Sequence, residues 1–144
     1  MLLQLRIENL ATIRNLDVEF NAGFSILTGE TGAGKSIMID AILLVLGHRG
    51  DPEMIRTGEE QSVVEAIFSV PENSVQGEKF DLRSELDDSG IDLEDEIIVR
   101  CLISRKGRQK RLINGVSVTA DFLKKVGRQL INIHGQHDNQ SLLQ

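Results

Sequence analysis

One segment constrains the fold of this chain more than any other: Gly29-Glu30-Thr31-Gly32-Ala33-Gly34-Lys35-Ser36. It fits the pattern G-x-x-x-x-G-K-[ST], whose backbone N–H groups turn inward around the phosphates of a nucleotide. Glycines supply the backbone angles and the close approach that such a turn requires. Lys35 can then reach the β- and γ-phosphates, and the Ser36 hydroxyl can ligate Mg²⁺.

A phosphate-binding loop of this kind, a P-loop, lies between a buried strand and a helix. The short apolar segment from Phe24 to Thr28 predicts the strand. The nearly continuous apolar run from Ser36 to Leu46 predicts the helix, and Gly47 is a suitable residue to end it. Both flanking elements are therefore expected, which argues against an incidental lysine in a glycine-rich turn.

The composition indicates one domain, or part of one, with an aliphatic core, since 40% of the 144 residues are hydrophobic and Trp and Tyr are absent. The single cysteine, Cys101, excludes an intrachain disulfide and is expected to be a small core residue in a reducing compartment. The N-terminus lacks the apolar stretch of a signal peptide. The longest apolar run, Ile37 to Leu46, is too short to span a bilayer and contains Asp40, which we expect to be exposed or structural.

Charge is distributed unevenly along the chain. The net charge of −6 is concentrated in the acidic segment from Glu78 to Glu96. A basic run follows, made of Arg100, Arg105, Lys106, Arg108, Lys110 and Arg111. This run has two interpretations, a set of contacts to DNA phosphates and a solvated hairpin tip. It contains no aromatic residue, so stacking on single-stranded bases is not indicated.

The remaining pattern predicts an α/β fold, in which a mixed sheet surrounds the P-loop helix and part of the sheet is antiparallel. Asn114-Gly115 between apolar runs predicts a hairpin, and Thr119 is expected to cap a helix. The expected strands are Met1–Asn9, Leu16–Phe20, Gln61–Val70, Glu96–Ser104, Arg111–Ile113, Val116–Val118 and Leu130–Ile133, and the further helices are Glu78–Asp88 and Ala120 to about Arg128.

Four segments in this order resemble the N-terminal part of the RecN family: Leu5-Arg6-Ile7-Glu8-Asn9-Leu10, the P-loop with Thr28, Leu112-Ile113-Asn114-Gly115, and Ile133-His134-Gly135-Gln136-His137. That family comprises bacterial ATPases of DNA double-strand-break repair, which are related to SMC proteins and have an ABC-type head. The resemblance implies that residues 1–144 form the N-terminal lobe of such a head, with the P-loop at 29–36 and a Q-loop near 134–137.

The same resemblance implies that the ATPase needs parts that this sequence does not contain. The family's second lobe carries the ABC signature, the Walker B carboxylates and the switch histidine, and a coiled coil joins the lobes. None of these patterns is found in the chain. We therefore expect ATP and Mg²⁺ as cofactors, no catalytic residue in this lobe, and negligible hydrolysis without the C-terminal lobe and a second head.

The partners implied by the resemblance are the chain's own C-terminal lobe, a second head in a homodimer, DNA at double-strand ends or single-stranded regions, and the recombinase machinery. The implied location is the cytoplasm, in association with the nucleoid, with no membrane partner. The sequence does not indicate which DNA structure is preferred.

The family motifs assign roles to individual residues. Gln136 would contact Mg²⁺ or the attacking water, and Arg14 would lie near the adenine and phosphates; Gln136 as a plain polar loop residue is the alternative. Arg56, with Arg49 as its rival, would act in DNA sensing and head engagement, and a solvated surface arginine is the alternative. His134 and His137 lack the third and fourth ligands that a zinc site requires. DNA or head contacts are also expected from Arg105, Lys106, Arg108 and Lys110.

Two other functions remain open from the residues. A self-contained nucleotide kinase would need an acceptor site, an arginine-bearing lid and an aspartate at the end of a buried strand. A module that binds ATP only to gate dimerisation would need none of these. Addition of the missing lobe separates the hypotheses, because only a true half-ATPase should then gain turnover.

Overall fold

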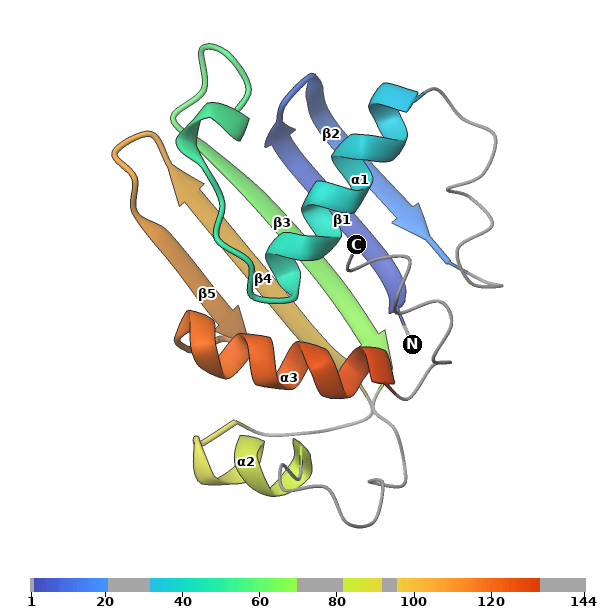
Figure 1. The fold of residues 1–144 in the computed structure, drawn as a ribbon, viewed down its shortest axis with the longest axis vertical. Helices are drawn as coiled ribbons and strands as arrows, with labels where there is room; N and C mark the ends of the chain where they lie inside the picture. The colour runs from blue at the N-terminus through green and yellow to red at the C-terminus, as the bar shows by residue number, and fades with distance from the viewer. Residues whose placement is uncertain (1, 21–31, 70–81, 92–95, 133–144) are drawn as a thin grey trace.

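The computed structural model describes residues 2–20, 32–69, 82–91 and 96–132. An antiparallel sheet carries two longer helices on one face, as Figure 1 shows. In chain order the elements are β1 (Leu2–Leu10), β2 (Ile13–Glu19), α1 (Gly32–Val45), the 3₁₀ turn η2 (Pro52–Met54), β3 (Gln61–Ser69), α2 (Leu82–Asp88), β4 (Glu96–Ser104), β5 (Gln109–Ile113), β6 (Val116–Ser117) and α3 (Ala120–Asn132).

The six described strands form a single sheet in the order β2-β1-β3-β4-β5-β6. Every strand pairing in the described part of the chain is antiparallel. The α/β class expected from the sequence is confirmed. The parallel strand of the expected mixed sheet falls on Phe24 to Thr28, which lies outside the described residues.

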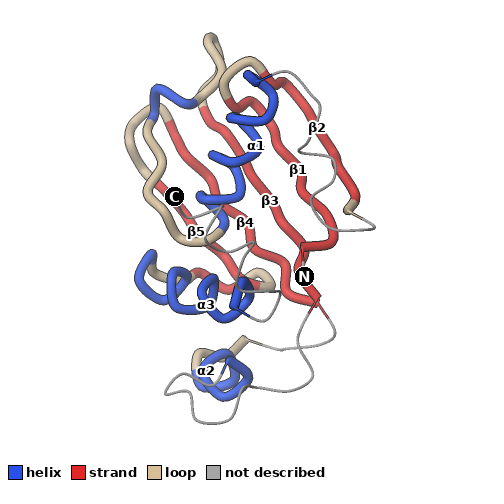
Figure 2. Tube along the Cα trace, turned by 45° about the vertical axis from the view of Figure 1, so that its right-hand side comes forward, coloured by secondary structure: helices blue, strands red, loops and turns tan. Residues whose placement is uncertain are grey.

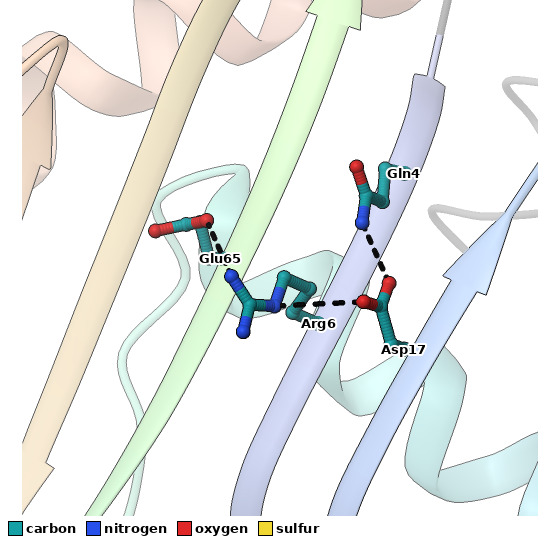
Figure 3. Close-up of polar contacts among 4 residues, drawn as sticks. All are labelled: Gln4, Arg6, Asp17 and Glu65. Carbon is teal, nitrogen blue, oxygen red and sulfur yellow. Dashed lines mark hydrogen bonds and ion pairs between the residues drawn. The ribbon is translucent and has the colours of Figure 1, made fainter.

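The two faces of the sheet differ because side chains alternate along each strand. One face is apolar and packs against α1 and α3, with Leu5, Ile7, Val64, Val99 and Ile113 each at most 1% exposed. The other face carries charged residues in cross-strand register. There Arg6 pairs with Asp17 on β2 and Glu65 on β3, each at 3.8 Å, and Gln4 donates a hydrogen bond of 2.6 Å to Asp17 (Figure 3). Exposed pairs of this kind contribute at most about 1 kcal/mol to stability.

Local signals explain the hairpin and the helix ends. Asn114 and Gly115 have φ values of 48° and 85°, as a tight turn that matches strand twist requires, and the predicted hairpin is confirmed. Thr119 Oγ1 accepts a hydrogen bond of 3.1 Å from Phe122 N–H, so its predicted role as the cap of α3 is also confirmed. Gly47, with φ of 100°, follows the end of α1 as expected.

The expected strand from Leu130 to Ile133 is wrong for the residues that are described, because α3 continues to Asn132. Leu123, Val126 and Leu130 recur at helical spacing and are at most 2% exposed. Extension of the helix buries Leu130 on the same apolar stripe, which a strand would not. The helix expected from Glu78 to Asp88 begins at Leu82 in the described residues, and its Leu86 is completely buried.

Candidate nucleotide-binding site

The C-terminal half of the P-loop pattern opens α1. Gly32 through Ser36 form its first residues, four residues earlier than the predicted helix start, and Gly29, Glu30 and Thr31 lie outside the described residues. The first N–H groups of a helix have no partner within it, and the helix dipole is positive there. The first turn contains no acidic residue to compete for these donors. Ser36 is exposed, so its hydroxyl is available to a ligand.

The helix α1 crosses the apolar face of the sheet diagonally, and its first turn lies near the turn between β1 and β2 (Figures 1 and 2). Several residues of α1 are buried in the core and hold the helix there; Ala41, Ile42, Leu44 and Val45 are at most 4% exposed. Asp40 is exposed, as expected. A ligand at the N-terminal end of α1 would therefore meet a helix whose orientation is set by the core.

The helix α3 crosses the C-terminal end of α1 at two glycines. A Cβ atom on Gly47 would lie 2.7 Å from the backbone nitrogen of Lys124, and one on Gly127 would lie 3.0 Å from the carbonyl oxygen of Leu46. The backbones therefore approach more closely than larger residues would permit. The chain leaves α3 toward the predicted Q-loop, but Gln136 and the histidines beside it lie outside the described residues.

The segment after α1 is fastened to the sheet by a side chain that the sequence did not single out. Gln109 on β5 donates a hydrogen bond of 2.6 Å to the Gly50 carbonyl and accepts one of 3.1 Å from Gly50 N–H. Arg111 donates to the same Gln109 side chain at 2.8 Å. Arg111 of the basic run therefore supports a structural contact. No short-range sequence pattern could reveal the pairing of Gln109 with Gly50, because the two residues are far apart in the chain.

The arginines proposed for the site lie on different elements. Arg14 is exposed on the edge strand β2. Arg49 is exposed just after the C-terminal end of α1, which is about 20 Å from the first turn at 1.5 Å per residue. Arg56 is half-buried, and its backbone N–H donates to the Asn9 carbonyl at 2.8 Å, beside the β1–β2 turn. Of the two rivals, Arg56 is therefore the one at the end of the sheet where α1 begins.

The basic hairpin between β4 and β5 presents Lys106, Arg108 and Lys110 as exposed side chains. Arg105 differs from them. Its Nε–H donates to the Glu59 carbonyl at 2.8 Å, and its Nη2–H donates to the Arg56 carbonyl at 3.0 Å. The structure thus joins the Arg56 backbone to the hairpin through the Arg105 side chain.

Within the described residues, no group of three His, Cys, Asp or Glu side chains is arranged to hold a metal ion. The possible Mg²⁺ ligand in the described part is the Ser36 hydroxyl, an oxygen donor of the kind that Mg²⁺ prefers. None of the described helices is both long and apolar enough to cross a membrane.

The fold and the P-loop residues at the start of α1 indicate the class of protein to which the chain belongs. Residues 4–144 match the AAA domain family, and the chain belongs to that family. The chain is 45% identical, over its whole length, to the DNA repair protein RecN of Bacillus subtilis and 42% identical, over 99% of its length, to RecN of Halalkalibacterium halodurans. The resemblance to RecN seen in the motifs is thereby confirmed. The chain spans about a quarter of each relative, 24% in both cases.

Solved structures support the same fold. One, from work on the ATP-driven dimerisation and DNA-stimulated activation of SMC ATPases, has a TM-score of 0.64 at 22% identity and covers 99% of this chain and 90% of its own. The SMC head domain from Thermotoga maritima has a TM-score of 0.57 at 21% identity, covering 86% of this chain and 41% of its own. At these identities the likeness establishes the fold.

Proposed function

We propose that the chain is the ATP-binding N-terminal lobe of a RecN-like ATPase that acts in DNA double-strand-break repair and recombination. The observation that carries the proposal is the start of α1, where Gly32 to Ser36 of a complete P-loop pattern form the first turn of a helix fixed in the core. A helix whose first turn contains no acidic residue is suited to bind phosphate at its N-terminus.

Each residue of the P-loop would have a separate role in nucleotide binding. The backbone of Gly29, Glu30, Thr31, Gly32, Ala33 and Gly34 would surround the phosphates, and Lys35 would neutralise charge on the β- and γ-phosphates. Ser36 would ligate Mg²⁺, which supplies a charge that draws the phosphate oxygens together. Gln136 would add a second oxygen ligand, and Arg14 would border the nucleotide.

Hydrolysis requires more than this lobe. The sequence contains no run of four apolar residues that ends in Asp-Glu, the carboxylate pair that would hold Mg²⁺ and orient a water molecule. We infer that the second lobe and a second head supply these groups, so that the chain alone binds ATP without turning it over. The chain's length, 24% of the matching RecN proteins, supports this inference.

The partners follow from the same proposal. They are the C-terminal lobe, a second head, DNA and the recombinase machinery, in the cytoplasm at the nucleoid. Arg56 is the preferred DNA-sensing residue over Arg49, because its backbone is bonded to Asn9 at the end of the sheet where α1 begins.

ATP binding by this chain tests the proposal. Calorimetric titration with ATP and Mg²⁺ should give one site, and Lys35→Ala should weaken it about 10- to 100-fold, since a hydrogen bond to a charged group contributes about 1.5–3 kcal/mol. Lys106→Ala is the matched control, because it removes an exposed lysine from the hairpin. Equal binding by the Lys35→Ala and Lys106→Ala variants would contradict the proposal.

A further inference from the structure

The segment from Arg56 to Glu60 is held by one side chain from another part of the sheet. Arg105 directs two guanidinium N–H groups to two carbonyls of this segment, those of Arg56 and Glu59. Its own backbone N–H donates to a third, that of Glu60, at 2.9 Å. Glu59 N–H also donates to the Arg56 carbonyl at 3.0 Å, so the segment is a closed turn.

The opposite side of the same segment is bonded to the β1–β2 turn. Arg56 N–H donates to the Asn9 carbonyl at 2.8 Å, and Ala11 N–H donates to the Met54 carbonyl at 2.6 Å. Asn9 and Ala11 both have positive φ, 56° and 52°, an uncommon conformation that directs the backbone toward the segment. The N–H and the carbonyl of Arg56 are therefore both fixed, each by a different part of the sheet.

The side chain of Arg56 is left for another partner. It is half-buried, and none of the hydrogen bonds or ion pairs between described residues involves its guanidinium. Lys106 and Arg108 are exposed on the adjoining hairpin, where Gly107 permits a tight turn with φ of 87°. Arg105 is exposed as well, so three of the four consecutive hairpin residues from Arg105 to Arg108 are basic and exposed.

We propose that Arg105 is a positioning residue, which joins the β4–β5 hairpin and the Arg56 segment into one basic surface for the phosphates of duplex DNA. Arg56, Lys106 and Arg108 contact phosphate, whereas Arg105 directs its Nε–H and one Nη2–H to carbonyls of the protein. The DNA part of this inference rests on the proposed function, whereas the bracing by Arg105 rests on the hydrogen bonds alone. It departs from the expectation that Arg105 is itself a DNA contact.

The substitution Arg105→Lys separates these two roles. Lysine keeps the positive charge, but its compact ammonium cannot reproduce the planar fork that reaches two carbonyls at once. If Arg105 braces the segment, Arg105→Lys weakens DNA binding as much as Arg105→Ala does. If Arg105 contacts phosphate, Arg105→Lys binds like the unchanged protein, and Arg105→Ala lowers the salt dependence by about one counterion.

The experiment uses the full-length protein that carries this chain and a mixed-sequence DNA duplex, with affinity measured across a series of KCl concentrations. Arg105→Lys and Arg105→Ala should each weaken binding about tenfold with an unchanged slope against salt. Arg108→Ala is the control for a direct contact, because its exposed side chain should leave the fold intact while the slope falls by about one.

Hydrogen exchange supplies a readout that does not require DNA. The amides of Arg56 and Glu59 should exchange at least tenfold faster in Arg105→Lys than in the unchanged protein, and Arg108→Ala should leave them as they are. Unchanged exchange in Arg105→Lys, or unchanged DNA binding by it, would overturn the positioning role. If the unchanged protein fails to bind the duplex, the DNA surface is overturned, and exchange still decides separately whether Arg105 braces the segment.

Discussion

Cys101 links α1 to the sheet at the level of a single residue. Its thiol is 5% exposed on β4 and donates a hydrogen bond of 3.3 Å to the Leu44 carbonyl near the end of α1. Burial raises the pKa of this thiol from its ordinary value of 9.0 to about 12, although the nearby Arg111 acts in the opposite direction. The expected core role of Cys101 is confirmed.

The raised pKa of Cys101 gives a pH-dependent prediction. At pH 8 the thiolate fraction should be about 1,000-fold lower than in the unfolded chain, so a thiol-specific reagent should label the folded protein at least 1,000-fold more slowly. A folded-state pKa above the unfolded value means that the protonated thiol stabilises the fold fully below pH 9. This contribution is lost as the pH rises toward 12. Rapid labelling of folded protein at pH 8 would contradict the described burial, and Cys101→Ser provides the blank.

At the scale of elements, the crossing of α1 and α3 depends on two glycines. Gly47 and Gly127 allow the two helices to approach where α1 ends. α1 begins with P-loop residues, and the predicted Q-loop follows α3 in the sequence. A change in the crossing should therefore affect both stability and nucleotide binding.

Replacement of Gly47 tests the crossing. Gly47→Ala places a Cβ 2.7 Å from the Lys124 backbone nitrogen at a φ of 100°, and should cost about 2–4 kcal/mol from overpacking and backbone strain together. Gly107→Ala is the matched control, because its φ is similar at 87° and its surroundings are open. It should cost only about 1 kcal/mol. Urea denaturation of both variants measures the difference, and equal losses would show that the helices do not approach as described.

How far each element could be predicted from the sequence depends on the range of the interactions that set it. The Asn114-Gly115 turn, the Thr119 cap and the end of α1 at Gly47 follow from local backbone preferences. The extent of α3 does not, because a short apolar run at Leu130 is equally compatible with a strand until the neighbouring stripe is known.

The contacts of the candidate site also divide into those set by consecutive residues and those set by residues far apart in the chain. The P-loop pattern predicts a helix and a phosphate-binding role from consecutive residues, and the helix is present. The contacts of Arg105 with Arg56 and of Gln109 with Gly50 join residues far apart in the chain. These residues come together only when the chain is folded. The sequence therefore shows that Arg105 is basic, but it does not show whether Arg105 positions the Arg56 segment or contacts DNA.

At the scale of the whole molecule, the chain corresponds to only part of the length of its relatives. Its fold matches that of SMC heads, and it spans about a quarter of the RecN proteins that it resembles. We propose that Lys35 and Ser36 bind a nucleotide and that a second lobe supplies the groups that activate water. We therefore expect ATP binding and ATP hydrolysis to be separable properties of different parts of the protein.

The most direct measurement is ATP turnover by this chain alone and after addition of the C-terminal lobe, with Mg²⁺ present and Lys35→Ala as the control. We predict no Lys35-dependent turnover by the chain alone and its appearance when the second lobe is supplied. Lys35-dependent turnover by the chain alone would contradict the account, because it would mean that these 144 residues contain a complete catalytic site.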